Sequence, residues 1–194
     1  LLYAGEPGVQ LTWMDAKVGD KVITPRTGKP VEIQALWYNA LRTMQEFALR
    51  FGHNEDAARF GAMAELAKLS FNSAFWNEET ECLFDVVCNG ERDASIRPNQ
   101  ILAASLFHSM LDEERMKKIV DRVESELLTP MGLRSLTPRD PAYVPFYRGG
   151  PYERDSAYHQ GTVCAWLIGP FVDAYRKLYP DREEHISEIL KPLA

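Results

Sequence analysis

Apolar residues recur at helical spacing in about six stretches of the chain. The first stretch runs from Val31 to about Phe51, and the second from Asn54 to about Trp76. Gly52 is a suitable stop between them, and Asn54 is a suitable N-cap for the second helix. Because only a few residues separate the two stretches, we expect two antiparallel helices that pack side by side.

Two further pairs follow the same pattern. The predicted helices are 101–110, 112–127 with Asp112 as its N-cap, 156–178, and about 182–190. Gly169-Pro170 lies inside the third of these and is expected to kink or break it. Cys82–Val87 is short, apolar and β-prone, which predicts a strand or an extended edge.

The long irregular segments fall on alternate connections. They cover residues 1–29, 89–98 and 129–157, and the last of them is too rich in aromatic residues to be disordered. Alternate long connections place all the loops at one end of an array of helical hairpins. An all-α toroid of helical hairpins accounts for this pattern better than a straight solenoid, which would have shorter and more regular loops.

Charge and composition limit the classes of molecule that the chain is expected to bind. The net charge of −6 disfavours a nucleic-acid backbone or an anionic membrane as partner and is compatible with a neutral polymer. No apolar run approaches the roughly 20 residues of a membrane span. The three cysteines form no CxxC pair, which indicates reduced, buried thiols and a cytoplasmic protein. We also expect the chain to be part of a longer polypeptide, since it begins without Met.

The first candidate for chemistry is Asp15, which lies between Trp13-Met14 and Ala16. An apolar setting raises the pKa of a carboxyl, as a general acid requires, and an indole offers a flat face to a pyranose. The alternative is an ordinary turn aspartate that caps the local backbone.

A second group surrounds the start of the first helix. Arg26 and Lys29 are two cations that could bind a ligand or simply lie on the surface, and Glu32 could complement the helix dipole. Trp37 is a core residue or a sugar platform. Asn39, on an apolar helix face, needs a hydrogen-bond partner that a hydroxyl-rich ligand would supply.

The third group lies in residues 152–163, where an acidic loop leads into a helix with Tyr, His and Gln. Asp155 could cap this helix. His159 has no histidine partner at i+4, so a zinc helix is not indicated. The sequence contains no nucleophile elbow, phosphate-binding loop or dinucleotide fingerprint, and no cofactor or metal is expected.

Four segments together resemble the C-terminal glucosidase domain of glycogen debranching enzymes. These are Leu11–Ala16, Thr24–Leu41, Arg97–Gln100 and Arg154–Val163, in that order along most of the chain. The resemblance implies the (α/α)6 toroid of glucoamylase-like hydrolases, with about half of its twelve helices present, and residues 1–194 as part of that catalytic domain. It also implies amylo-α-1,6-glucosidase activity, in which the glucose stub at a branch point of glycogen or a limit dextrin is hydrolysed with inversion.

The resemblance also assigns residues. The aspartate of the family's Trp-Met-Asp-Ala motif falls on Asp15, the implied general acid. The implied substrate-binding residues are Trp13, Arg26, Lys29, Glu32, Trp37, Asn39, Asn99, Gln100, Asp155, Tyr158, His159 and Gln160.

Inversion needs a second carboxylate, about 6.5–9.5 Å from the first, to activate water. Glu32, Glu153 and Asp155 are the candidates within the chain, whereas the resemblance places this base beyond Ala194. The isolated chain is therefore expected to be inactive. The chain departs from the family at Cys164-Ala165, where a Trp-Pro pair is usual, so one aromatic residue of the site is missing.

Two other classes of function stay open. One is a related toroid enzyme, such as a sugar epimerase or a glycoside phosphorylase, although the sequence shows no phosphate cradle. The other is a non-catalytic helical carbohydrate-binding module. Release of glucose from a branched limit dextrin would distinguish the hydrolase from both.

Overall fold

The computed structural model describes residues 1–193. The α-helices in this part of the chain are α1 (Val31–Arg50), α2 (Asn54–Phe75), α3 (Ile101–Ser105), α4 (Glu113–Leu127), α5 (Pro151–Tyr158), α6 (Ile168–Leu178) and α7 (Glu183–Leu190). Three short 3₁₀ turns accompany them: η1 (Pro98–Gln100), η2 (Ala165–Leu167) and η3 (Lys191–Leu193).

The strands are very short and pair antiparallel. They are β1 (Lys17–Val18), β2 (Lys21–Val22), β3 (Lys29–Pro30), β4 (Trp76–Asn77), β5 (Cys82–Leu83), β6 (Val86–Cys88), β7 (Glu91–Asp93), β8 (Leu128–Thr129), β9 (Gly132–Arg134) and β10 (Val163–Cys164). They form the sheets β1-β2, β3-β6-β7, β4-β5 and β10-β9-β8. In the last sheet, Leu133 of β9 pairs with Leu128 on one side and Cys164 on the other.

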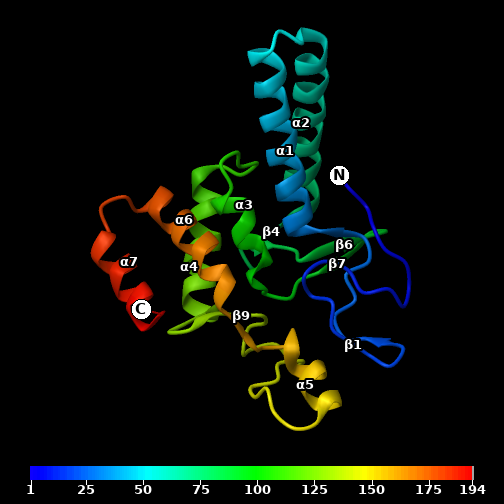
Figure 1. Cartoon of the computed structure of the whole chain (residues 1–194), viewed down its shortest axis with the longest axis vertical. Helices are drawn as coiled ribbons and strands as arrows, with labels where there is room; N and C mark the ends of the chain where they lie inside the picture. Colours follow the sequence, from blue (N-terminus) through cyan, green and yellow to red (C-terminus); the bar gives the residue numbers. More distant parts are fainter. Residues whose placement is uncertain (194) are drawn as a thin grey trace.

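The first helix pair is confirmed as an antiparallel hairpin. Gly52 lies in the turn with φ +78°, a conformation that glycine adopts without strain. Figure 1 shows α1 and α2 side by side, projecting away from the rest of the molecule. The irregular segments around β1, β9 and α5 lie at the opposite end, as the alternation of long and short connections predicts.

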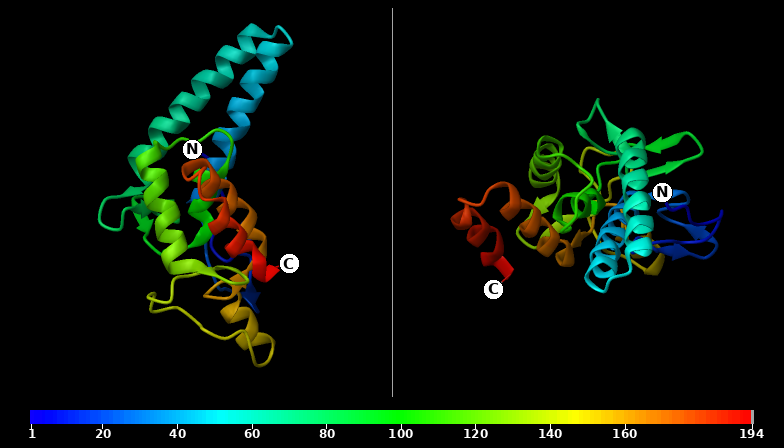
Figure 2. Two further views of the ribbon diagram at one scale, coloured as in Figure 1. Left: turned by 90° about the vertical axis from the view of Figure 1, so that its left-hand side faces the viewer. Right: turned by 90° about the horizontal axis from the view of Figure 1, so that it is seen from above.

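The core lies where α3, α4 and α6 meet the inner half of the α1–α2 hairpin. Phe71 and Phe75 of α2 stack there with ring centroids 4.7 Å apart. Figure 2 shows α4, α6 and α7 on one side of the molecule and α1, α2 and the N-terminal segment on the other. The predicted N-cap of α4 is confirmed, because Oδ1 of Asp112 accepts a hydrogen bond from the Arg115 backbone N–H at 2.8 Å.

The prediction of one helix over 156–178 is wrong. The chain leaves the helical conformation after α5, turns at Gly161 with φ +138°, and pairs as β10 with β9. A Cβ at Gly161 would lie 2.6 Å from the Val144 carbonyl oxygen, so the turn fits only glycine. Pro170 stands in the first turn of α6, where no backbone N–H is needed, and so begins a helix rather than breaking one.

The predicted helix 101–110 is also too long, because α3 ends at Ser105. The Ser109 hydroxyl donates to the Ala103 carbonyl at 2.8 Å and accepts from the Leu111 N–H at 3.1 Å. These bonds replace further helical turns. The side chain of Lys177 covers the end of α3 by donating to the carbonyls of Ser105 and Leu106.

Candidate active site

The loop that carries Asp15 is fixed by the residues around it. Met14 is fully buried and anchors the loop, while the Asp15 side chain is 64% exposed. Thr12 has a positive φ of 63°, which is uncommon for a residue with a side chain. Its hydroxyl accepts hydrogen bonds from Arg26 at 3.0 Å and from the Met14 N–H at 3.3 Å, and these bonds support the strained turn.

The guanidinium of Arg26, which also donates to Thr12 of this loop, binds two carboxylates. Its Nε and one terminal nitrogen donate to Asp85 at 2.9 and 3.0 Å, and both terminal nitrogens donate to Glu32, one of them at 2.7 Å. All three side chains are buried. Burial raises the pKa of the Glu32 carboxyl, and the adjacent Arg26 cation opposes that rise. Arg26 and Glu32 thus satisfy each other inside the protein.

Asn99, in η1, connects the buried Asp85 to the partly buried indole of Trp13. Its Nδ2 donates to Asp85 Oδ1 at 2.7 Å, and its Oδ1 accepts from the indole Nε1 of Trp13 at 2.7 Å. The amide therefore uses both of its ends. This bridge sets the plane of the Trp13 ring beside Asp15.

Arg97 organises the other side of the site. Its terminal nitrogens donate to the carbonyls of Ser135 at 3.1 Å and His159 at 2.6 Å, and to Oε1 of Gln160 at 2.8 Å. Its Nε lies 3.9 Å from Asp85. Arg97 thereby fixes the backbone of the turn in which α5 ends.

His159 lies at that turn, and its side chain is only 1% exposed. The ring meets Trp13 edge to face, with centroids 5.2 Å apart, and its Nε2 lies 3.8 Å from Oδ1 of Asp15. Burial lowers the pKa of His159 to about 4, so the imidazole is neutral near pH 7. Neither ring nitrogen has a hydrogen-bond partner among the described residues.

The structure therefore brings together Trp13, Asp15, Asn99 and His159, supported by the buried Arg26 and Glu32 and by the partly buried Gln160. Gln100 is also buried, and its amide is used by the Leu83 N–H and the Arg97 carbonyl. Asp155 and Tyr158 lie on α5 before His159, and the exposed Tyr158 ring lies 4.4 Å from the His159 ring. Asp155 lies inside α5, so the alternative reading of it as an N-cap is wrong.

The remaining three predicted residues have partners elsewhere. Lys29 lies in β3 with its ammonium 5.2 Å from the Tyr3 ring centre. Trp37 packs against the hydrophobic core. Asn39 Oδ1 accepts from the His108 N–H at 3.1 Å, so a protein group supplies a partner for this amide without a ligand.

Three further residues of the site, Asp85, Arg97 and Trp166, were not predicted from the sequence. Asp85 was marked only by being a carboxylate between the apolar pairs Leu83-Phe84 and Val86-Val87, in a segment predicted to be a strand. A charge in such a place needs a buried partner, and two arginines supply it. The exposed Trp166 lies edge to face with Trp13 at 5.3 Å.

Comparison with known proteins identifies the family. Residues 1–194 match the family described as amylo-alpha-1,6-glucosidase. The chain belongs to the amylo-α-1,6-glucosidase family. It is 27% identical to the glycogen debranching enzyme of Saccharomyces cerevisiae over 87% of its own length and 14% of that protein. It is also 26% identical to the periplasmic trehalase of Salmonella newport over 62% of its length and 21% of that protein.

The fold also has a relative among solved structures. The neutral trehalase Nth1 of S. cerevisiae superposes with a TM-score of 0.62 over 77% of this chain and 28% of that one, at 17% identity. The chain thus has the α/α-toroid fold that the resemblance implied. It spans less than a third of the length of each of these relatives. This member of the amylo-α-1,6-glucosidase family thus shares its fold with a trehalase.

The family departure at Cys164-Ala165 lies next to the site. Cys164 is the last residue of β10, and burial raises the pKa of its thiol to about 11. Ala165 begins η2, the turn that presents Trp166 to Trp13. Compared with the Trp-Pro pair that the resemblance implies here, the chain has a small thiol in place of one aromatic side chain and keeps the neighbouring indole.

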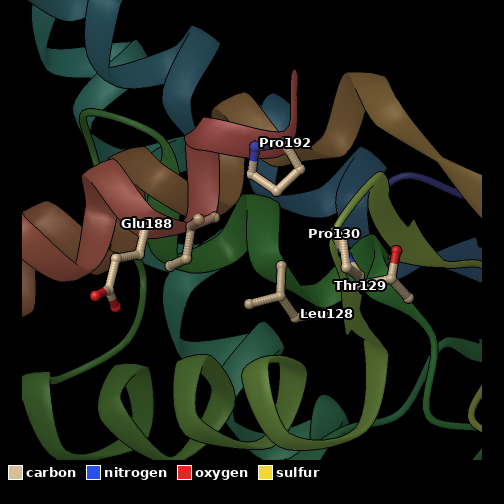
Figure 3. A pocket seen from close by; sticks show the side chains of 6 residues that line it. Leu128, Thr129, Pro130, Glu188 and Pro192 are labelled. Carbon is tan, nitrogen blue, oxygen red and sulfur yellow. The ribbon is translucent and has the colours of Figure 1, made fainter. Parts of the chain in front are cut away.

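A separate hollow of about 320 Å³ lies between the β8–β9 turn and the C-terminal helical segment (Figure 3). Its lining includes Leu128, Pro130, Ile189, Pro192 and a single carboxylate, Glu188. None of the predicted site residues lines it, so we do not assign the chemistry to it. Within residues 1–193, no helix is both long and apolar enough to cross a bilayer.

Proposed function

We propose that this chain supplies the acid side of an inverting amylo-α-1,6-glucosidase, which removes the glucose stub at branch points of glycogen-like α-glucans. The observation that carries the proposal is the exposed carboxylate of Asp15, whose Oδ1 lies 3.8 Å from Nε2 of His159, a ring that packs against the indole of Trp13, in a chain of this family. A general acid must reach the leaving oxygen, and Asp15 has the required exposure.

The predicted residues around Asp15 have two proposed roles, which are sugar contact and support of the site. Trp13, Tyr158 and the newly found Trp166 present aromatic faces or edges near Asp15 and are proposed to contact the sugar. Arg26, Glu32, Asn99, Gln100 and Gln160 have protein partners, and we propose that they hold the site in shape. Asp155 stays a proposed ligand for sugar hydroxyls.

The second carboxylate is proposed to lie outside this chain. Glu32 is buried and bound in full by Arg26, so it is not available to activate water. The other two candidates within the chain, Glu153 and Asp155, both lie on the short helix α5, and we propose neither of them as the base. Since the chain spans 14% of the yeast debranching enzyme, we propose that the remaining toroid helices carry the base and that residues 1–194 alone are inactive.

Hydrolysis of α,α-trehalose is a second candidate, because trehalases are among the similar proteins. Both reactions protonate a glycosidic oxygen, so Asp15 would serve either. We favour the α-1,6-glucosidase because the family match covers the whole chain, whereas the bacterial trehalase match covers 62% of it.

The test uses the complete polypeptide that contains this toroid segment. It is incubated with a 6-O-α-glucosyl maltooligosaccharide and with α,α-trehalose, and released glucose is followed by NMR from the first minutes. We expect β-glucose from the branched substrate and little from trehalose. Glucose from trehalose alone would favour the second candidate, and α-glucose as the first product would contradict inversion.

The partner and compartment are part of the same proposal. The partner is a branched α-glucan, and a charge of −6 is poorly suited to nucleic acid or an anionic membrane. All three cysteines are free thiols, which is compatible with the cytoplasm.

A further inference from the structure

The side chain of His159 is the most unusual polar group in the structure. It is buried, yet neither ring nitrogen has a partner among the described residues. Buried polar atoms are nearly always hydrogen-bonded, so an unpartnered pair in one ring needs an explanation. A group that can approach the ring would explain it, and the Asp15 carboxylate lies 3.8 Å from Nε2.

The surroundings leave the ring itself little freedom. Its backbone carbonyl is bound by Arg97 at 2.6 Å, and Trp13 and Tyr158 lie against the ring at centroid distances of 5.2 and 4.4 Å. Asp15, in contrast, is exposed. A separation of 3.8 Å is too long for a hydrogen bond, but a small rotation of the Asp15 side chain would close it. Catalytic hydrogen bonds often tighten in this way when substrate binds.

We propose that His159 is a positioning residue for the general acid: its neutral Nε2–H donates to Oδ1 of Asp15 and leaves Oδ2 to carry the proton to the leaving oxygen. The inference rests on the proposed function and assigns His159 a role other than direct sugar contact. Proton delivery breaks the Oδ2–H bond and forms an O–H bond on the leaving sugar. Asp15 then becomes a carboxylate, and the bond from His159 becomes charge-assisted and stronger.

Burial of His159 serves this role. An imidazolium beside Asp15 would hold the carboxyl ionised and prevent it from acting as an acid. The Asp15 carboxylate favours protonation of the ring, whereas burial and the cations Arg97 and Arg26 oppose it, and the pKa of His159 falls to about 4. The site therefore offers Asp15 a donor that carries no charge at neutral pH.

The choice of tautomer follows from the partners. Nε2 has an acceptor within reach, whereas Nδ1 has no acceptor or donor among the described residues. A buried N–H without an acceptor is rarer in proteins than an unpaired acceptor. The proton is therefore assigned to Nε2, and Nδ1 keeps its lone pair.

The experiment compares His159→Phe and His159→Gln in the complete polypeptide with two substrates. Phe keeps an aromatic ring of similar width but donates nothing, whereas the Gln amide can still donate. With the 6-O-α-glucosyl maltooligosaccharide, we expect kcat to fall about 10- to 100-fold in His159→Phe and less in His159→Gln. With α-glucosyl fluoride, whose leaving group needs little protonation, both variants should stay within about threefold of wild type.

The pH profile adds a readout that a purely structural role would not move. Loss of the donor destabilises the Asp15 carboxylate, so the alkaline limb of kcat/KM should move upward in His159→Phe by about one pH unit. An unmoved limb with equal losses on both substrates would overturn the proposal in favour of a sugar-contact or packing role. If wild type releases no glucose from the branched substrate, the proposed function fails instead.

A measurement on unmodified protein covers the case in which His159→Phe does not fold. Imidazole ¹⁵N NMR should show a protonated Nε2 and an unprotonated Nδ1 at pH 7, with no ring titration above about pH 5. A ring protonated at Nδ1, or one that titrates near pH 6.5, would overturn the assignment.

Discussion

The indole Nε1 of Trp13 donates a 2.7 Å hydrogen bond to Oδ1 of Asn99, a residue 86 positions later in the chain. The same amide donates to Asp85, which also accepts hydrogen bonds from Arg26. The aromatic wall beside Asp15 is therefore positioned by a buried network rather than by its own loop.

Asn99→Ala should lower the free energy of unfolding by about 1–3 kcal/mol, because it leaves the Trp13 N–H without its partner and removes one of the two hydrogen bonds to Asp85 Oδ1. Chemical denaturation followed by circular dichroism measures the loss. Asn54→Ala is the matched control, since Asn54 is exposed at the start of α2 and should change stability by less than about 0.5 kcal/mol. Equal effects of the two substitutions would show that the bridge contributes nothing.

Arg26→Met should destabilise the protein by about 3–5 kcal/mol at pH 7, because it leaves the carboxylates of Asp85 and Glu32 buried without their shared cation. Burial already raises the pKa of Glu32, and loss of the cation raises it further. Protonation then relieves the penalty, so the loss should shrink as the pH falls toward 4.5. Urea unfolding at several pH values measures it, with the exposed Arg59→Met as control.

His159 predicts a pH dependence of stability with a defined sign. Its folded pKa of about 4 lies below the unfolded value of about 6.5, so between these values the unfolded chain binds the extra proton. The stability contributed by the neutral ring is therefore complete above pH 6.5 and is lost as the pH falls toward 4, by at most about 3 kcal/mol.

Between pH 7 and pH 4, the free energy of unfolding of His159→Gln should fall by up to about 3 kcal/mol less than that of wild type. Urea unfolding from pH 4 to 7 measures this difference. His53→Gln is the control, because His53 is exposed before α2 and should leave the slope as in wild type. If wild type and His159→Gln show the same slope, His159 is not buried as a neutral ring.

The sequence predicted the parts of the fold that depend on local periodicity. The α1–α2 hairpin and α4 with its Asp112 cap follow from apolar spacing, a glycine stop and cap chemistry. The segment 156–178 did not follow, because β10 pairs with β9 some 30 residues earlier, and pairing over that distance leaves no periodic signal. The Ser109 bonds that end α3 are local, but they are made by one side chain and leave no periodic signal either.

The sequence predicted which residues lie in the site better than it predicted what each of them does. Trp13, Asp15, Asn99 and His159 were all selected, and the structure brings them together. The roles became clear only from burial. In the sequence, Arg26 and Glu32 could be surface or ligand-binding residues, whereas in the structure they are buried and bind each other. The apolar neighbours of Asp15 predicted an apolar setting for its carboxyl, whereas the structure buries Met14 and exposes Asp15. Alternation along an irregular loop cannot be read from residue types alone.

The most direct test of the central claim is the turnover of Asp15→Asn in the complete polypeptide on two substrates. Asn is nearly isosteric, so packing beside Met14 should survive, but it cannot deliver a proton. We predict that glucose release from the 6-O-α-glucosyl maltooligosaccharide falls by at least about 10²–10⁴-fold, that hydrolysis of α-glucosyl fluoride is largely spared, and that the exposed control Asp20→Asn changes neither. Normal release of the α-1,6 glucose stub by a folded Asp15→Asn would contradict the account, because the general acid would then be another residue.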